Sequence, residues 1–284
     1  MGKLKIEKKY KTFSYKKFFI VLTSLFLAAI YISPLYVLIT NSFKTQKGFF
    51  QSVISLPNKE TFTMENYKNA FSKLNYVKSF SNSLYITIVS VALILLFSSM
   101  AAWILVRTDS KISKIIFVSF SIAILIPFQS TMLPLMMVSK KLNLLNPAGL
   151  ILMYVGFGMS FSIFTIHGFI KNIPKELEEA AIIDGCNFLQ LFFRIVVPLL
   201  KVILISVAVL NIIWIWNDYL LPSIVLKNPE DKTLPLMTYN FFGEYSKKWD
   251  LATAALFMCV IPVIVFYSLA QKYIISGITE GSIK

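Results

Sequence analysis

The sequence predicts an all-α membrane protein with six transmembrane helices. Hydrophobic residues make up 56% of its 284 residues and charged residues only 15%, which is more apolar surface than a soluble domain requires. Six apolar stretches are long enough to cross a bilayer, and inside a bilayer each is expected to be helical because no water satisfies its backbone. All 28 lysines and arginines lie outside these stretches. The net charge of +14 therefore indicates membrane lipid, not nucleic acid, as the anionic partner.

The first predicted span covers residues 18–40 and follows a leader, residues 1–17, that contains seven lysines. A secretory signal peptide has an apolar core of only about 7–15 residues, so we interpret this stretch as an uncleaved span. The other spans are predicted at 84–106, 115–138, 148–170, 202–221 and 251–270. Pro34, Pro127 and Pro134 fall inside spans, where neighbouring helices are expected to absorb the kinks.

The distribution of basic residues predicts the orientation of the chain in the membrane. With the N-terminus in the cytoplasm, 16 of the 28 Lys and Arg residues fall in the cytoplasmic segments 1–17, 107–114, 171–201 and 271–284. The lysine-rich leader beside the first span strengthens this assignment. We therefore expect both termini and segment 171–201 to be cytoplasmic, and the segments 41–83 and 222–250 to be extracytoplasmic.

The first outer segment, 41–83, is too long to be a simple connector. Thr63 can cap a helix over residues 64–73, with apolar side chains at helical spacing. Two interpretations are open for this helix: it lies on the membrane surface, or it forms a docking surface for a partner.

The polar segment 171–201 separates two long apolar runs. Pro174 can occupy the first turn of a helix, and Glu176, Glu178 and Glu179 follow near the positive end of its dipole. Gly185 is expected to stop this helix because glycine adopts a left-handed backbone without steric cost. A second helical stretch is predicted over 187–196, running to Pro198. The spacing alone is equally consistent with an ordinary amphipathic loop.

The pattern in this segment resembles a known motif. Glu179-Ala180-Ala181, three residues, Gly185, nine residues, Ile195, two residues and Pro198 are similar to the EAA loop of ABC importer permeases. Val197 stands where that family usually has leucine, an apolar-for-apolar difference. The resemblance extends over residues 34–284. It includes Ser42-Phe43-Lys44, Glu65-Asn66-Tyr67, Trp216-Asn217-Asp218-Tyr219 and the loop 227–236, the last two similar to the carbohydrate-uptake, maltose-type branch.

The resemblance implies a type I ABC importer permease fold and the role of the second permease subunit of a sugar importer in the bacterial plasma membrane. Its implied partners are two ATP-binding ABC subunits, a related second permease and an extracytoplasmic sugar-binding protein. The implied mechanism is alternating access, coupled to the ATPase through the EAA loop. Residues assigned to this coupling by the resemblance are Glu178, Glu179, Ala180, Ala181, Asp184, Gly185, Ile195 and Pro198. A tail contact with the ATPase is implied for Gly277, Thr279 and Gly281.

The fifth predicted span is the least apolar. Asn211, Trp214 and Asp218 share one face of a helix because they are spaced by three and four residues. An intramembrane carboxylate usually faces the bundle interior or a wet cavity, so this face can line the translocation path, with Trp214 or Trp216 offering a ring to a sugar. Alternatively, Asp218 lies at the outer interface in an ordinary aromatic belt with Trp216 and Tyr219.

Several chemistries find no support in the sequence. None of the ten glycines belongs to a P-loop, so we expect ATP to be bound by the partner subunit and no cofactor by this chain. No catalytic or metal site is expected, since Cys186, Cys259 and His167 lack partners at ligand spacing. Two alternatives to sugar import stay open: the same architecture for a polyol or glycerol phosphate, and an ATPase-independent channel or scaffold.

Overall fold

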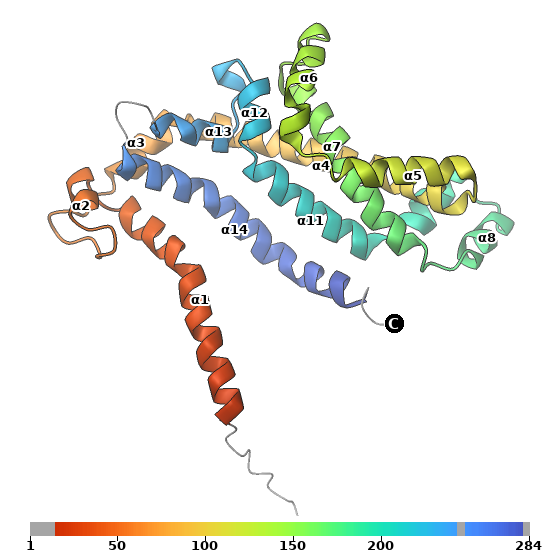
Figure 1. The fold of residues 1–284 in the computed structure, drawn as a ribbon, viewed down its shortest axis with the longest axis horizontal. Helices are drawn as coiled ribbons and strands as arrows, with labels where there is room; N and C mark the ends of the chain where they lie inside the picture. The colour runs from red at the N-terminus through yellow and green to blue at the C-terminus, as the bar shows by residue number, and fades with distance from the viewer. Residues whose placement is uncertain (1–14, 243–247, 281–284) are drawn as a thin grey trace, which may run out of the picture.

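The chain folds almost entirely into helices, as the computed structural model shows for residues 15–242 and 248–280 (Figure 1). The first half contains α1 (Tyr15–Ser42), α2 (Gln46–Gln51), α3 (Glu65–Lys73), α4 (Tyr76–Arg107), α5 (Lys111–Ala123), α6 (Phe128–Lys141) and α7 (Pro147–Ile170). The second half contains α8 (Glu176–Ile183), α9 (Phe188–Leu191), the π-helix η1 (Phe192–Val196), α10 (Val197–Leu199), α11 (Lys201–Asn217), α12 (Leu220–Val225), the 3₁₀ turn η2 (Pro229–Asp231), α13 (Leu234–Thr238), the 3₁₀ turn η3 (Tyr239–Phe241) and α14 (Trp249–Glu280).

Four helices among the described residues are long and apolar enough to cross a membrane, or up to six spans if each of two bent helix pairs counts as one. The long helices α4, α7, α11 and α14 form the packed body (Figure 1). Helix α4 packs along α7, and α11 contacts both of them and α14. Gly158 in α7 permits the close approach, because a Cβ there would lie 2.5 Å from Ile94 of α4. The chain thus has the helical architecture that its composition predicts.

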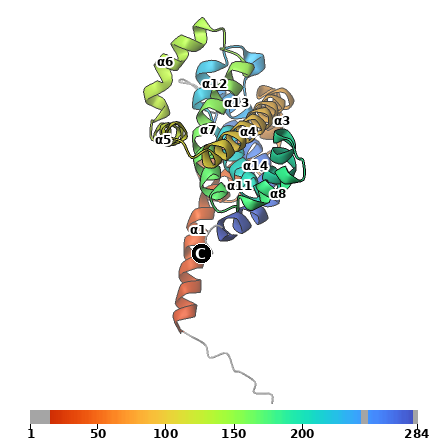
Figure 2. The ribbon, with the colours of Figure 1, turned by 90° about the vertical axis from the view of Figure 1, so that its right-hand side faces the viewer.

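Helix α1 leaves this body and points away from it (Figures 1 and 2). None of the residues in its apolar window is buried in the chain. It contacts α14, and the neighbouring outer segment holds it in place. Lys44, just after α1, is fully buried, and its ammonium nitrogen donates to the Ser52 carbonyl at 2.8 Å. Asn66 of α3 donates to the Lys44 carbonyl at 2.7 Å, which joins α3 to the end of α1.

The outer helix predicted over 64–73 is α3, and it packs against α14 of its own chain. Ala70 and Leu74 on its apolar face are completely buried. The Thr63 hydroxyl accepts from the Glu65 backbone N–H at 3.1 Å, while the residue at the N-cap position is Met64. The apolar face of α3 is therefore buried in the core of its own chain. The following span, α4, begins at Tyr76, earlier than the predicted residue 84.

The span predicted over 115–138 is not one helix. It consists of α5 and α6, which meet at an angle of 105°, and Figure 2 shows α6 turned away from the body. Proline disfavours helical backbone in the residue before it and lacks an N–H, and α5 ends at Ala123, before Pro127. Pro127 itself has an extended backbone (ψ 137°) at the N-cap of α6. Pro34 and Pro134 lie inside the helices α1 and α6, so of these three prolines only Pro127 stands at a break between two helices.

The span predicted over 202–221 also ends early. Helix α11 stops at Asn217, and Asp218 has an extended backbone (ψ 131°) before α12 begins. A continuous helix would place Pro222 four residues after the Asp218 carbonyl, where the proline ring clashes and offers no N–H. The Asp218 carboxylate instead accepts from the Leu220 N–H at 3.0 Å, which stabilises the break.

Candidate functional site

The EAA loop forms a short helix, a sharp turn and a second helix at one end of the bundle (Figure 1). Helix α8 begins at Glu176, two residues later than a helix with Pro174 in its first turn would. Gly185 has φ +84°, and no atom lies within 4 Å of the position of a Cβ there. The Gly185 and Cys186 N–H groups donate to the carbonyls of Ile182 and Ala181, both at 3.0 Å, the hydrogen-bond pattern of a Schellman C-cap. The backbone conformation, not space, therefore requires glycine here.

The second helix of the loop begins with a capping box between Asn187 and Gln190. It continues as α9, η1 and α10, and it meets α11 at an angle of 77°. The Val197 N–H donates to the Phe192 carbonyl, and the next residue, Pro198, has no N–H for the Arg194 carbonyl. A local π-helix accommodates this missing donor. The predicted helix over 187–196 is present, with this irregularity at its end.

Glu178 does not face outward with the other acidic residues of α8. Its carboxylate accepts from the Trp103 ring N–H at 2.9 Å and from Arg107 at 2.6 and 2.9 Å. Arg107 also donates to the Ile173 carbonyl at 3.2 Å. The Glu178 and Arg107 side chains are only 10% and 16% exposed. This Trp103–Arg107–Glu178 cluster fixes α8 to the end of α4, so the Glu178 carboxylate is engaged inside the chain, and its assignment to coupling stays a prediction.

The two alanines of the loop also separate. Ala181 is buried in the apolar cluster that includes Ile170, Phe192 and Leu200, whereas Ala180 is exposed. Ala181 therefore lies on the inner face of α8, where packing decides its position, and Ala180 is the alanine on the outer face. The outer face consists of Glu179, Ala180, Asp184 and the exposed apolar side chains Leu177, Ile182 and Ile183. Ile195 is half-buried against the same cluster, and Pro198 is exposed.

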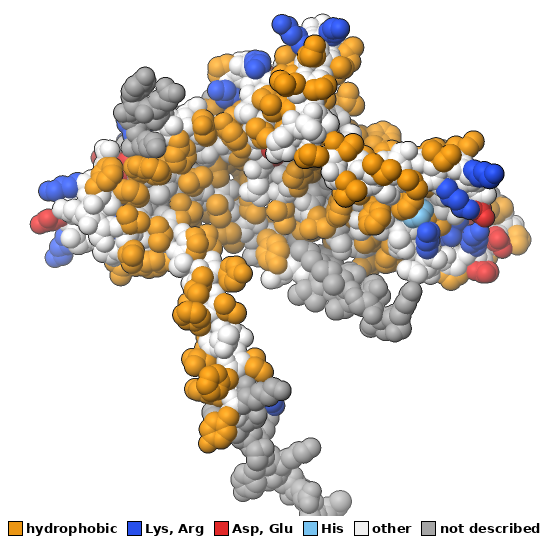
Figure 3. Space-filling view, in the orientation of Figure 1, with side chains coloured by type: hydrophobic (Ala, Val, Ile, Leu, Met, Phe, Trp, Pro, Cys, Tyr) orange, Lys and Arg blue, Asp and Glu red, His pale blue; other side chains and the backbone are white. Residues whose placement is uncertain are grey.

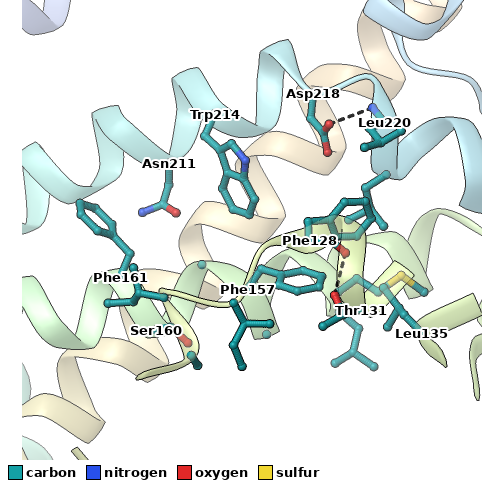
Figure 4. Close-up of a pocket in the computed structure, with 18 of the residues that line it drawn as sticks. Phe128, Thr131, Leu135, Phe157, Ser160, Phe161, Asn211, Trp214, Asp218 and Leu220 are labelled. Carbon is teal, nitrogen blue, oxygen red and sulfur yellow. Dashed lines mark hydrogen bonds between the residues drawn. The ribbon is translucent and has the colours of Figure 1, made fainter. Parts of the chain in front are cut away.

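A second feature is a cavity of about 960 Å³ between the bent pair α5–α6 and the helices α7, α11 and α12 (Figure 4). Asn211, Trp214 and Asp218 all line it. Aromatic and small polar side chains form much of the opposite wall, among them Phe128, Thr131, Phe157, Ser160 and Phe161. The structure thus brings the three residues of the predicted face into one cavity, which we call the central cavity.

Internal contacts hold these three residues in place. Asn211 donates its side-chain N–H to Ser162 at 3.1 Å and to the Val207 carbonyl at 2.9 Å. Asp218 accepts from the Tyr154 hydroxyl at 2.9 Å, and the Tyr154 ring meets Trp214 edge-on with centroids 5.5 Å apart. Trp214 itself is 41% exposed, so part of its indole is free to contact a ligand.

The two tryptophans of the fifth span have different surroundings. Trp216 is buried in the apolar cluster between α3, α11 and α14. Its ring lies edge-on to Phe80 with centroids 5.6 Å apart, and its N–H donates to the Cys259 carbonyl at 3.5 Å. Of the pair proposed from the sequence, only Trp214 reaches the central cavity.

The other residues singled out from the sequence are spread over α7, α14 and the segment after Gly185. Gly277 and Thr279 fall in the last turns of α14, and Gly281 lies outside the described residues. Cys186 and Cys259 are free cysteines. His167 is buried and stacks on Phe117 with centroids 3.7 Å apart, so it packs in the helix bundle. Among residues 15–242 and 248–280 no group of His, Cys, Asp and Glu has the arrangement of a metal site.

Sequence reasoning overlooked Trp103 and Arg107, which bind Glu178, and Tyr154, which binds Asp218. A signal for the first two exists: a tryptophan and an arginine four residues apart stand at the end of the second span, so they share a helix face there. Tyr154 has no comparable signal. It lies within a long apolar run, and the sequence does not show which residue of that run contacts Asp218.

The chain belongs to the family of binding-protein-dependent transport system inner membrane components, whose family model matches residues 94–280. This confirms the resemblance to ABC importer permeases and places the protein in the bacterial plasma membrane.

Two relatives and one solved structure illustrate the similarity. The chain is 44% identical, over 95% of its length and 97% of the relative's, to the probable starch degradation products transport system permease protein AmyC of Thermoanaerobacterium thermosulfurigenes. It is 32% identical, over 88% and 91%, to the multiple sugar-binding transport system permease protein MsmG of Streptococcus mutans. It also resembles a chain of a bacterial ABC transporter involved in alginate import, with a TM-score of 0.78, 22% identity and coverage of 93% and 99%. That likeness confirms the type I ABC importer permease fold.

Proposed function

We propose that this chain forms half of the translocation path of an ATP-driven importer of disaccharides and oligosaccharides. Its proposed partners are two ATP-binding subunits, a second related permease and an extracytoplasmic sugar-binding protein. The family description, which specifies binding-protein-dependent transport, and the names of the relatives, which specify starch degradation products and multiple sugars, support this proposal. ATP is bound by the partner subunits and not by this chain.

The division of α8 into an inner and an outer face is the observation that supports coupling most directly. The inner face is attached to α4 by the Trp103–Arg107–Glu178 cluster, while Glu179, Ala180 and Asp184 are exposed. A partner that pushes on the outer face therefore moves α4 with it. Exposed ion pairs contribute only about 0–1 kcal/mol each, so shape complementarity around Ala180 and the apolar side chains is the main source of docking energy.

In the proposed orientation both termini and the EAA loop are cytoplasmic, and the outer segment with α2, α3 and α13 faces the binding protein. Motion of the ATPase pair is transmitted through α8 to the long helices. These then expose the central cavity alternately to the two sides of the membrane. A channel or scaffold that needs no ATPase is the alternative.

Ala180→Trp is the variant that tests docking. The indole would project from the exposed outer face and separate it from a partner, while the inner contacts of α8 stay intact. We expect membrane insertion as in the wild type, loss of ATPase subunits from the affinity-purified complex, and loss of sugar uptake. Lys140→Trp on the exposed end of α6 is a matched control and should retain both. Equal recovery of ATPase subunits with both variants would contradict the proposed coupling surface.

The lining of the central cavity favours a neutral solute over glycerol phosphate. Among its described lining residues are the carboxylate of Asp218 and the amide of Asn211, but no lysine or arginine. A phosphate would meet a like charge in a poorly solvated space, without a cation to compensate its desolvation. Trp214 offers an exposed ring face to the apolar side of a sugar.

Trp214→Ala and Asp218→Asn test this path. A stacked ring contributes about 0.5–1.5 kcal/mol, so Trp214→Ala should raise the KM for uptake about 3- to 10-fold with unchanged protein level. Asp218→Asn should also raise the KM for uptake. The Tyr154 hydroxyl and the Leu220 N–H would then donate to a neutral amide, which is a weaker acceptor than the carboxylate. Phe97→Ala, which removes an exposed aromatic of α4 outside the cavity, is the control. Wild-type kinetics in both cavity variants would exclude these residues from the path.

A further inference from the structure

A second hollow, of about 430 Å³, lies at the end of the bundle that bears α8. We call it the lysine cleft, because Lys114, Lys171 and Lys175 all line it. These residues come from three segments: the first turn of α5, the end of α7 and the residue before α8. Figure 3 shows lysine and arginine side chains gathered around the histidine at this end of the molecule.

The charges in the lysine cleft are only partly balanced. Asp109 pairs with Lys114 at 2.8 Å. This hydrogen bond, together with the charge of Lys114 and, less strongly, that of Lys175, holds the pKa of the Asp109 carboxyl below its usual value. Among the described residues, no ion pair neutralises Lys171 or Lys175. Three ammonium groups and one carboxylate leave a formal charge of +2 on the lining.

The nearby carboxylate of Glu178 does not compensate this charge, because Arg107 already occupies it at 2.6 Å. His167 forms part of the wall and is stacked on Phe117. Thr108, whose hydroxyl can donate a hydrogen bond, and Ser113, whose hydroxyl is hydrogen-bonded to that of Ser110 at 3.0 Å, also line the cleft. The site therefore offers cations and neutral donors to an anion.

The other half of the lining is apolar. Leu105, Val106, Phe117 and Val118 line the cleft. Val118 is 51% exposed, and Ile115 and Ile122 on the same helix are also exposed, so this part of α5 presents an apolar surface toward the bilayer. A ligand that fills the cleft needs an anionic group beside an apolar group, which inorganic phosphate lacks.

We propose that the lysine cleft binds the phosphate group of an anionic phospholipid, with the glycerol and first acyl carbons against α5. Basic pockets between transmembrane helices on the cytoplasmic side are suited to such headgroups. The placement of the cleft at the cytoplasmic surface rests on the proposed function. The bound lipid joins α5 to Lys175, the residue at the start of α8, and so steadies the base of the coupling helix.

Lipid binding to the isolated full-length chain tests this inference without transport. The chain is purified in a neutral detergent and titrated with phosphatidylglycerol or phosphatidylcholine, and native mass spectrometry counts the bound lipids. We expect wild type to prefer phosphatidylglycerol, and Lys171→Gln/Lys175→Gln to bind it about 10- to 30-fold more weakly, since each lysine near a headgroup contributes about a factor of five. Lys140→Gln/Lys141→Gln, which removes the same charge from the exposed end of α6, should bind like wild type.

Each other outcome overturns the proposal. Equal weakening in both double variants would indicate general surface charge instead of a site. Displacement of phosphatidylglycerol by millimolar inorganic phosphate would identify a soluble phosphate as the ligand. No preference between the two lipids would show that the cleft does not recognise charge. Matching gel-filtration profiles of all variants establish folding, and because no transport is measured, failure here leaves the proposed sugar import untouched.

Discussion

Glu178→Ala is expected to abolish most sugar uptake, whereas Glu179→Ala is expected to retain much of it. The two carboxylates are neighbours on α8, but Glu178 is buried with Trp103 and Arg107 while Glu179 is exposed. Removing one partner of a buried pair costs about 3–5 kcal/mol, because the remaining charge loses its compensation. An exposed pair contributes about 0–1 kcal/mol. The difference is large enough to release α8 from the end of α4.

The measurements are sugar uptake and ATP hydrolysis by the assembled complex. In Glu178→Ala we expect uptake to fall while subunits that still assemble hydrolyse ATP without transport. Arg107→Ala should show the same defect. A double-mutant cycle of Arg107→Ala and Glu178→Ala should give an interaction energy of about 1–3 kcal/mol between the two side chains. If Glu178→Ala and Glu179→Ala reduce uptake equally, the inner anchor of α8 has no special role.

Gly185→Val is the second variant expected to have a large effect. At φ +84° a β-branched residue is strained by about 1–3 kcal/mol, although there is open space for its side chain. The strain is relieved only if the Schellman turn opens and the second helix of the loop changes direction relative to α8. We expect uptake to fall about ten-fold or more, with normal insertion into the membrane.

Gly185→Asn is the matched control, because asparagine tolerates the left-handed conformation better than other side chains. It should retain most uptake although it is larger than alanine. Gly185→Ala should lie between the two. If Asn and Val reduce uptake to the same extent, then contact with a partner, and not the backbone angle, makes glycine necessary at this position.

Much of the architecture could be predicted from the pattern of residues along the chain. The span expected over 148–170 is Pro147–Ile170, and the outer helix expected over 64–73 is Glu65–Lys73. The turn at Gly185 lies where the glycine predicts it. These features depend on charge-free length, helical spacing and local backbone preference, all of which are properties of neighbouring residues.

The bends within the spans could not be predicted from the local pattern of residues. Pro34, Pro127 and Pro134 have the same chemistry, yet only Pro127 separates two helices at a sharp angle. Whether a missing hydrogen bond becomes a mild kink or a break depends on what packs against it. That information comes from other segments and is absent from the local pattern.

The sequence by itself determined that this protein is helical and apolar enough to cross a membrane several times, and its spaced motif indicated an ABC importer permease, because hydropathy and motif spacing are properties of the residue order. Only the tertiary structure decided that Glu178 and Ala181 face inward, that Trp214 and not Trp216 reaches the central cavity, and that Lys114 shares a cleft with the distant Lys171 and Lys175. Helical spacing places side chains on a face, but the packing of remote helices decides what that face meets.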